Sequence, residues 1–290
     1  MDYIILTNPT ETELVTAVHE NLYSLFRSMQ ILPDSEVAES DKIGYHHAFP
    51  TNPMFKGAWR TRLPAEEAEA IIDETLAWFN ERKAPAFYWW TDPQTQPADL
   101  AERLLKRGFD GNLIGEPGMV ADLDVLNQDV RMPSELTIRQ VVDQETLLDW
   151  RDVFTASYEM PKAEGQAWYD ATVQAGLESA PWKMYVGYLG GKAVATSLLF
   201  NGAGVSGVYS IGTLPTERGK GIGTAITLKP LLDVRQQGYR FAVLFSSRMG
   251  YSVYQRLGFR EVVSKIGIYV MEKDGTWGST RQGTGIGHRT

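Results

Sequence analysis

The feature that most constrains the fold of this chain is a glycine-rich turn between a strand and a helix. Residues 205–214 have a strand pattern, and a helical pattern begins near residue 221. The first N–H groups of a helix have no intrahelical partner and lie at the positive end of its dipole, and glycine lets an anion approach the backbone closely. The turn therefore predicts a phosphate site in an α/β framework. Its glycines and flanking cations are Arg218, Gly219, Lys220, Gly221 and Gly223.

Two common phosphate-binding motifs do not match this spacing. A P-loop needs four residues between its first glycine and Gly-Lys-Ser/Thr, and the nearest run, from Gly187 to Lys192, is one residue short. A dinucleotide fingerprint needs Gly-x-Gly-x-x-Gly, whereas the turn has Gly-x-Gly-x-Gly. The next strand also ends in Phe245-Ser246-Ser247, where a dinucleotide site needs an acidic residue. Both nucleotide hypotheses therefore fail.

A second motif, Tyr-x-x-x-Gly-Phe, begins at Tyr254, 36 residues after Arg218. Taken together and in this order, the two motifs resemble those of the GCN5-related N-acetyltransferase (GNAT) superfamily. The superfamily's pyrophosphate-binding motif, Arg/Gln-x-x-Gly-x-Gly/Ala, is matched by Arg218, Gly221 and Gly223. The resemblance covers about residues 135–272.

This resemblance implies an acetyl-CoA-dependent N-acetyltransferase in which a free amine attacks the thioester directly, without a covalent enzyme intermediate. A backbone N–H would stabilise the oxyanion, and Tyr254 would protonate the departing thiolate. Ser247 lies where relatives often have an asparagine that contacts the cofactor. The resemblance assigns the pantetheine arm and thioester to Ile211, Gly212 and Thr213. It assigns the pyrophosphate to Arg218, Gly219, Lys220, Gly221, Ile222, Gly223 and Thr224.

The sequence leaves the general base and the acceptor open. Glu159 and Asp170 are candidate bases because acidic residues of the early helices often border the acceptor cleft in this superfamily, although an amine can also lose its proton through water. Rival hypotheses are a CoA-binding sensor or scaffold without turnover and an acyltransferase that uses a different acyl-CoA. The aromatic content of the first half favours a small-molecule amine over a protein terminus as acceptor. The oligomeric state is left open.

The length of 290 residues indicates about two domains, and an internal similarity indicates a repeat. Residues 104–109 align with residues 254–259, and each segment follows an aromatic-rich strand and a long amphipathic helix. We therefore expect an α/β (α+β) protein with two GNAT-like domains, at residues 1–130 and 131–272, each with a mixed, mostly antiparallel sheet flanked by helices. Residues 273–290 are expected to be a disordered tail.

The first copy is expected to be degenerate. Residues 59–64 stand in place of the glycine array, and Leu104 replaces the tyrosine. A side chain without a hydroxyl cannot donate a proton, and a loop without glycine cannot approach a pyrophosphate as closely. We expect this half to bind no acetyl-CoA and to serve as a structural partner or a wall of the acceptor pocket. Its His46-His47 pair predicts no metal site, because neighbours in a strand diverge.

The composition excludes several classes of binding partner. With 28 Lys and Arg against 36 Asp and Glu, the net charge of −8 lacks the basic footprint of a nucleic-acid-binding protein. The absence of cysteine excludes disulfides, a thiolate nucleophile and Cys-ligated metals. No secretory signal opens the chain, and the uncharged stretch 193–216 is broken by glycines and Pro215, which favours two strands and a turn. We expect a cytoplasmic protein with no nucleic-acid, membrane or metal partner.

Local patterns predict several element boundaries. A capping box at Thr10 and Glu13 predicts a helix start, and Pro64 predicts another. Residues 122–134 are expected to form a linker, because they are polar and contain Pro133. A helix over about residues 221–237 contains Pro230, which is expected to kink it.

Overall fold

The chain divides into two compact units, and each unit is built from two separate segments. Unit 1 comprises residues 1–25 and 116–264, and unit 2 comprises residues 26–115 and 265–290. The predicted domain boundary between residues 130 and 131 concerns the repeat along the sequence and stays a prediction. The compact units do not test it, because each unit combines segments from both sides of that boundary. The computed structural model describes residues 4–32, 34–48, 55–111, 117–263 and 266–272, so the expected tail lies outside the described residues.

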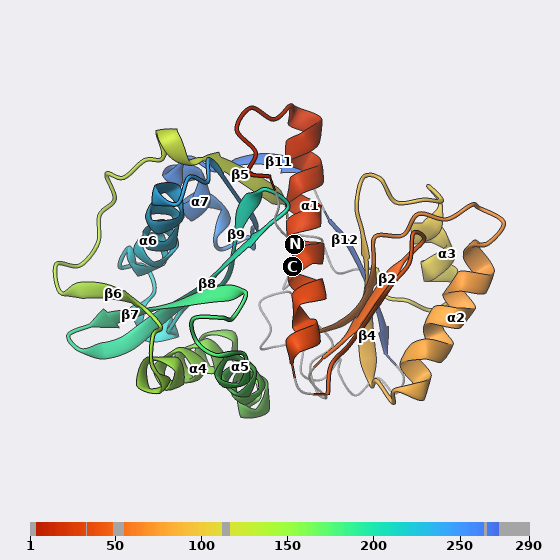
Figure 1. The fold of residues 1–290 in the computed structure, drawn as a ribbon, viewed down its shortest axis with the longest axis horizontal. Coiled ribbons are helices and arrows are strands. Elements are labelled where there is room, and N and C mark those ends of the chain that lie inside the picture. The colour runs from red at the N-terminus through yellow and green to blue at the C-terminus, as the bar shows by residue number, and fades with distance from the viewer. Residues whose placement is uncertain (1–3, 33, 49–54, 112–116, 264–265, 273–290) are drawn as a thin grey trace. The chain divides into compact units, whose positions relative to one another are not determined.

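Unit 1 is built on a seven-stranded mixed sheet in the order β11-β5-β10-β9-β8-β7-β6 (Figure 1). Paired neighbours are antiparallel except for β9 and β10, which are parallel. The expected mixed, mostly antiparallel sheet is therefore confirmed for this unit. The strands are β5 (Gly118–Asp122), β6 (Leu136–Gln140), β7 (Trp182–Leu189), β8 (Lys192–Gly202), β9 (Val205–Thr213), β10 (Phe241–Phe245) and β11 (Arg260–Val263).

Two helices of unit 1, α1 and α4, begin where side chains satisfy their first N–H groups. The predicted capping box is confirmed, because the Thr10 N–H donates to Glu13 Oε2 at 2.7 Å and the Glu13 N–H donates to Thr10 Oγ1 at 3.3 Å. Asp143 Oδ1 accepts from the Thr146 N–H at 2.8 Å in the same way. The helices are residues 11–25 of α1 (Glu11–Ser28), α4 (Gln144–Tyr158), α5 (Lys162–Ala175), α6 (Ile222–Gln236) and α7 (Tyr251–Leu257).

The sheet of unit 1 buries apolar side chains on both faces, because successive strand residues point in opposite directions. On β10, Ala242 and Leu244 pack into the core that includes residues of α6 and α7. The alternate residue Val243 packs instead with α1. From α1, the fully buried Asn21 donates to the carbonyl of Gly202 at 2.9 Å. The N-terminal helix is therefore an integral layer of unit 1.

Pro230 lies inside α6, which continues as one helix to Gln236. Proline has no N–H, so the Ile226 carbonyl loses its intrahelical donor. The Ser197 hydroxyl on β8 replaces that donor at 2.9 Å. A hydrogen bond from the sheet thus compensates for the proline; the predicted kink stays a prediction.

Unit 2 is built on a five-stranded mixed sheet in the order β1-β2-β3-β4-β12, in which β3 and β4 are parallel and the other pairs are antiparallel. Its core includes Phe79, Phe87, Trp89 and Leu104. The elements are β1 (Glu36–Glu39), β2 (Gly44–His47), β3 (Lys56–Trp59), α2 (Ala68–Glu81), β4 (Ala86–Thr91), α3 (Leu100–Lys106) and β12 (Gly267–Glu272).

Two predicted boundaries are wrong. The second helix begins at Ala68 instead of Pro64, because the Glu67 N–H donates to the Pro64 carbonyl at 3.1 Å and closes a turn first. The expected linker at 122–134 begins with the last residue of β5 and the short helix η3 (Leu123–Val125). The Leu123 N–H donates to the Arg240 carbonyl at 2.7 Å, so this stretch is anchored to unit 1.

The two units share one order of elements. In unit 2, β3, α2, β4 and α3 follow one another, and β3 is parallel to β4. In unit 1, β9, α6, β10 and α7 follow one another, and β9 is parallel to β10. The last helix of each series is followed by a glycine with positive φ, Gly108 at 87° and Gly258 at 104°. This shared order supports the tandem repeat.

Within the described residues, no helix has the length and apolar character needed to cross a membrane. The cytoplasmic location stays a prediction.

Candidate functional site

The parallel strands β9 and β10 pair over only part of their length. Ser206 pairs with Ala242 and Gly207 with Val243, and β9 and β10 do not pair beyond these residues. Among the residues that the structure describes, the last residues of β9 therefore have no strand partner on the β10 side. This opens the sheet at the C-terminal ends of the two strands, where ligands of α/β proteins commonly bind.

The end of β9 is bent by a β-bulge. The register against β8 shifts between Thr196 and Leu198, and Ser210 has a φ of 50°, which is uncommon for a residue other than glycine. The Thr196 hydroxyl donates to the Ser210 carbonyl at 3.1 Å, and the Tyr158 hydroxyl from α4 donates to the Ile211 carbonyl at 3.1 Å. These two contacts hold the backbone of residues 211–213 in its bent course.

Gly212 lets α4 approach this bend closely. A Cβ atom at this position would lie 2.7 Å from the Cβ of Ser157, which is closer than two carbon atoms can approach. The predicted pantetheine strand is therefore packed directly against the end of α4.

The glycine turn, residues 218–223, links β9 to α6 through the short helix η4 (Pro215–Glu217). Gly219 and Gly221 have φ values of 78° and 82°, a conformation that costs other residues about 1–2 kcal/mol. Arg218 Nε donates to the Thr213 carbonyl and its Nη2 to the Ser157 carbonyl, both at 3.1 Å. The Arg218 guanidinium, which the resemblance assigns to the pyrophosphate, thus fastens the turn to β9 and α4.

The N–H groups of the turn have no hydrogen-bond acceptor among the described residues. The first hydrogen bond of α6 runs from the Ala225 N–H to the Gly221 carbonyl at 3.1 Å. In the part of the chain that the structure describes, no backbone carbonyl accepts a hydrogen bond from the N–H groups of residues 219–224. Such a row of amides at a helix start is suited to an anion.

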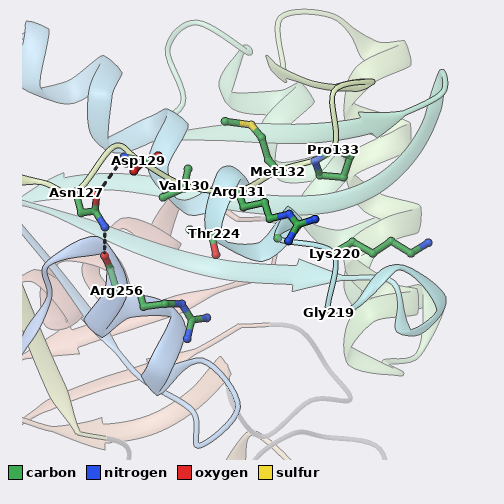
Figure 2. Close-up of a pocket in the computed structure, with 11 residues that line it drawn as sticks. Asn127, Asp129, Val130, Arg131, Met132, Pro133, Gly219, Lys220, Thr224 and Arg256 are labelled. Atoms are coloured by element: carbon green, nitrogen blue, oxygen red, sulfur yellow. Dashed lines mark hydrogen bonds between the residues drawn. The ribbon is translucent and has the colours of Figure 1, made fainter.

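A cavity of about 770 Å³ lies beside this turn (Figure 2). Of the predicted residues, Gly219, Lys220, Gly221 and Thr224 line it. The side chain of Ile222 is buried in the core instead, so only its backbone is available to a ligand. The complete lining is Asn127, Asp129, Val130, Arg131, Met132, Pro133, Gly219, Lys220, Gly221, Thr224 and Arg256.

The second wall of the cavity is the segment of residues 127–133, which we call the linker wall. Asn127 anchors it to α7, because its N–H donates to the Leu257 carbonyl at 3.1 Å and its Nδ2 donates to the Arg256 carbonyl at 2.9 Å. A Cβ on Gly221 would lie 2.1 Å from the Arg131 carbonyl oxygen. The linker wall therefore packs tightly on one glycine of the turn and leaves Gly219 open, with no atom within 4 Å of its Cβ position.

Tyr254 lies on α7 and is 7% exposed. Its ring contacts Phe259 edge-on at a centroid distance of 6.0 Å. A Cβ on Gly250 would lie 2.6 Å from the tyrosine ring, so the glycine makes room for it. This burial suits a core aromatic, and the role of its hydroxyl in proton transfer stays a prediction.

Comparison with known proteins identifies the fold and its family. The sequence matches the acetyltransferase (GNAT) domain family over residues 137–262. Residues 137–262, less than half of the chain, are therefore similar to GNAT acetyltransferase domains. The predicted resemblance is therefore confirmed. Over 109 residues, the chain is also 31% identical to a mycothiol acetyltransferase from Saccharomonospora viridis. That match covers 36% of this chain and only 35% of the relative's length.

Solved structures extend the fold comparison to nearly the whole chain. A GCN5-related N-acetyltransferase from Kribbella flavida aligns with a TM-score of 0.65 and 16% identity over 90% of this chain and 98% of its own. A second, from Sphaerobacter thermophilus, aligns at 0.61 and 16% over 91% and 94%. A tandem GNAT protein from the clavulanic acid biosynthesis pathway aligns at 0.58 and 13% over 93% and 98%. The expected fold class is thus confirmed.

Within the GNAT domain, Ser247 supports α7. Its Oγ accepts from the Gly250 N–H at 3.2 Å, and its carbonyl accepts from the Tyr251 N–H at 3.1 Å. These bonds hold the first turn of the helix that carries Tyr254. A contact of Ser247 with the cofactor stays a prediction.

The two candidate bases of the GNAT domain lie on its surface. Glu159 is exposed in the left-handed cap of α4, with a φ of 52°. Asp170 is exposed on α5, and its carboxylate accepts from Gln166 Nε2 at 2.8 Å. Their catalytic role stays a prediction. Among the described residues, no group of three or more His, Asp or Glu side chains could hold a metal ion.

Sequence reasoning missed the two arginines of the cavity, Arg131 and Arg256. Arg256 lies within the Tyr-x-x-x-Gly-Phe motif, two residues after Tyr254. Its position on the predicted helix was the signal in the sequence that could have identified it. The first lies in a segment without periodicity, and only its packing against Gly221 places it at the site.

Proposed function

We propose that this protein is an acetyl-CoA-dependent N-acetyltransferase that transfers an acetyl group to a primary amine by direct attack in a ternary complex. The observation that carries this proposal is the row of unused amides at residues 219–224, which faces an open cavity inside a GNAT domain. These amides bind the pyrophosphate of acetyl-CoA. Arg218 serves by holding the turn in place.

The bent end of β9 positions the thioester. Because β10 does not cover this edge, a backbone N–H of residues 211–213 points at the thioester carbonyl and stabilises the oxyanion that forms there. The contacts of Thr196 and Tyr158 with the bulge fix these amides before the substrate binds. Fixed dipoles need no reorganisation during the reaction, which is the source of their catalytic effect.

Tyr254 completes the transfer. The amine nitrogen bonds to the carbonyl carbon, the carbon–sulfur bond then breaks, and the departing thiolate takes a proton from the Tyr254 hydroxyl. The amine gives up its own proton through water or a nearby carboxylate. The acceptor is a small-molecule amine. The relative from Saccharomonospora viridis, which is named for mycothiol, supports this choice over a protein terminus.

The test is a screen of amines against acetyl-CoA with the full chain, with release of the CoA thiol as readout. We expect turnover with at least one small amine. Tyr254→Phe should lower kcat by about a hundredfold or more and change CoA affinity by less than about twofold. Tyr251→Phe is the matched control, because Tyr251 lies on the same helix and its hydroxyl donates to Glu261 at 3.0 Å.

CoA binding without turnover for any amine would instead favour the sensor or scaffold hypothesis. A panel of acyl-CoAs in the same assay separates acetyl transfer from transfer of a longer acyl group.

A further inference from the structure

Three cationic side chains from three separate segments surround the cavity beside the glycine turn. Arg131 comes from the linker wall, Lys220 from the turn and Arg256 from α7 (Figure 2). Asp129 is the acidic residue of the same lining. The cavity thus carries a local positive charge in a chain whose net charge is −8. Such a departure from the overall charge favours an anionic ligand.

The two arginines of this cavity differ from most other arginines of the chain. Arg240 binds Asp122 at 3.0 Å and Arg260 binds Glu11 at 2.6 Å, as is usual in an acidic protein. Among the described residues, no group forms a hydrogen bond or ion pair with the guanidinium of Arg131 or Arg256. Lys220, by contrast, pairs with Glu217 at 2.8 Å. Two guanidinium groups therefore keep their full donor capacity toward the cavity.

The arginines are held in place by their backbone. The side chain of Asn127 binds the Arg256 carbonyl at 2.9 Å, which ties the linker wall to α7. The Arg131 carbonyl packs against Gly221, as the 2.1 Å distance to a Cβ placed there shows. Both arginines are therefore fixed next to the turn that receives the pyrophosphate in the proposed function.

We propose that Arg131 and Arg256 bind the 3′-phosphate of coenzyme A and so select CoA over 3′-dephospho-CoA. This proposal rests on the proposed function, since the 3′-phosphate belongs to the nucleotide end that adjoins the pyrophosphate. A planar guanidinium binds a phosphate through two parallel hydrogen bonds and is the side chain best suited to it. Lys220 lies on the rim as a further positive charge.

The test compares binding of CoA and of 3′-dephospho-CoA to the full chain by calorimetry. The unaltered protein should bind CoA about tenfold or more tightly than dephospho-CoA, since charge-assisted hydrogen bonds are the stronger ones. Arg131→Gln and Arg256→Gln should each weaken CoA binding by about three- to tenfold, because both sites are exposed. Each variant should leave dephospho-CoA binding within about twofold of the original value.

Arg139→Gln is the matched control, because it removes the same charge from an exposed residue of β6 outside the cavity lining. It should change neither affinity. Equal weakening of both ligands by the cavity variants, or equal affinity of the unaltered protein for both, would overturn the 3′-phosphate site and leave the proposed function standing. Failure to bind either ligand would overturn the proposed function as well.

Discussion

The turn before α6 in unit 1 and the turn before α2 in unit 2 join the same kinds of elements but use their amides differently. In unit 1, the N–H groups of residues 219–224 have no backbone acceptor among the described residues. In unit 2, the Arg62 N–H donates to the Lys42 carbonyl at 2.7 Å and the Leu63 N–H to the Gln96 carbonyl at 3.1 Å. The described backbone thus leaves the amides of the first turn without an acceptor, whereas two amides of the second turn bind carbonyls of their own unit.

Side chains reinforce this difference. The fully buried Thr61 accepts from Trp89 Nε1 at 2.9 Å, and Arg62 binds Asp92 at 2.8 Å. The turn of unit 2 is therefore closed by a core contact and an ion pair. The same order of elements therefore contains two turns that differ in how their amide donors are used.

The last helices of the two series, α3 and α7, also differ. Leu104 of α3 is fully buried with Phe109 in its cluster, and Tyr254 of α7 is nearly buried beside Phe259. Both residues fill the same position against a following phenylalanine. Only the tyrosine adds a hydroxyl to that position.

The largest expected effect is the loss of unit 2 when β12 is removed. β12 pairs along all of β4 and buries Ile268 and Val270 to 4% and 2% exposure. Burial of each such side chain contributes about 1.5–3 kcal/mol, against a total of about 5–15 kcal/mol for a domain. A chain truncated before β12 should lose the unfolding transition of unit 2 in calorimetry.

A chain truncated after Glu272 is the control, because it retains β12. If the shorter chain kept both transitions, unit 2 would be independent of its last strand. The sheet of unit 2 would then be stable with its four other strands alone.

The next largest effect concerns the two glycines of the turn. Gly221→Ala should weaken CoA binding by about tenfold or more, because positive φ alone costs about 1–2 kcal/mol and the added Cβ also meets the Arg131 carbonyl. Gly219→Ala has the same φ penalty but open space, so its effect on CoA affinity should be smaller. Calorimetry with CoA measures both. Equal effects would mean that the linker wall does not shape the site.

A smaller effect is expected from Thr61→Val in unit 2. The variant leaves the Trp89 N–H without its acceptor in a buried place, which costs about 1–3 kcal/mol of unfolding free energy. CoA affinity should not change, because Thr61 lies in unit 2 and CoA binding is proposed for unit 1. Thr137→Val, at an exposed strand position, should stay within about 0.5 kcal/mol. A fall in CoA affinity for Thr61→Val would contradict the assignment of binding to unit 1.

The smallest effect is the contribution of His47 to the pH dependence of unit 2 stability. Burial lowers the pKa of His47 below its usual 6.5, and the nearby Lys56 and Arg82 lower it further, while Glu36 opposes them. As the pH falls below 6.5, His47 is protonated in the unfolded chain before it is protonated in the folded chain. The free energy of unfolding therefore decreases between pH 6.5 and the lower pKa of His47 in the folded chain. Unfolding of unit 2 at pH 7.5 and 5.5 should show this loss, and His47→Gln should reduce it. If His47→Gln left this loss of stability unchanged, titration of other groups would be its cause.

Much of the local structure follows from short-range signals. The capping residues Thr10 and Asp143 and the strand Ala86–Thr91 are where side-chain chemistry places them. The strand β5 was missed, because its partner β10 lies more than a hundred residues further along the chain. A five-residue strand has no local signal strong enough to separate it from a linker.

The candidate site was likewise predictable only in part from the sequence. The sequence alone determined the glycine turn and its helix, since positive φ and free N–H groups are properties of a few consecutive residues. Only the tertiary structure decided that Arg218 binds the Thr213 and Ser157 carbonyls, that Arg131 lines the cavity and that two amides of the unit 2 turn are bonded. These outcomes depend on which carbonyls and carboxylates distant segments bring within hydrogen-bonding distance, and that pairing is set by packing of the whole chain.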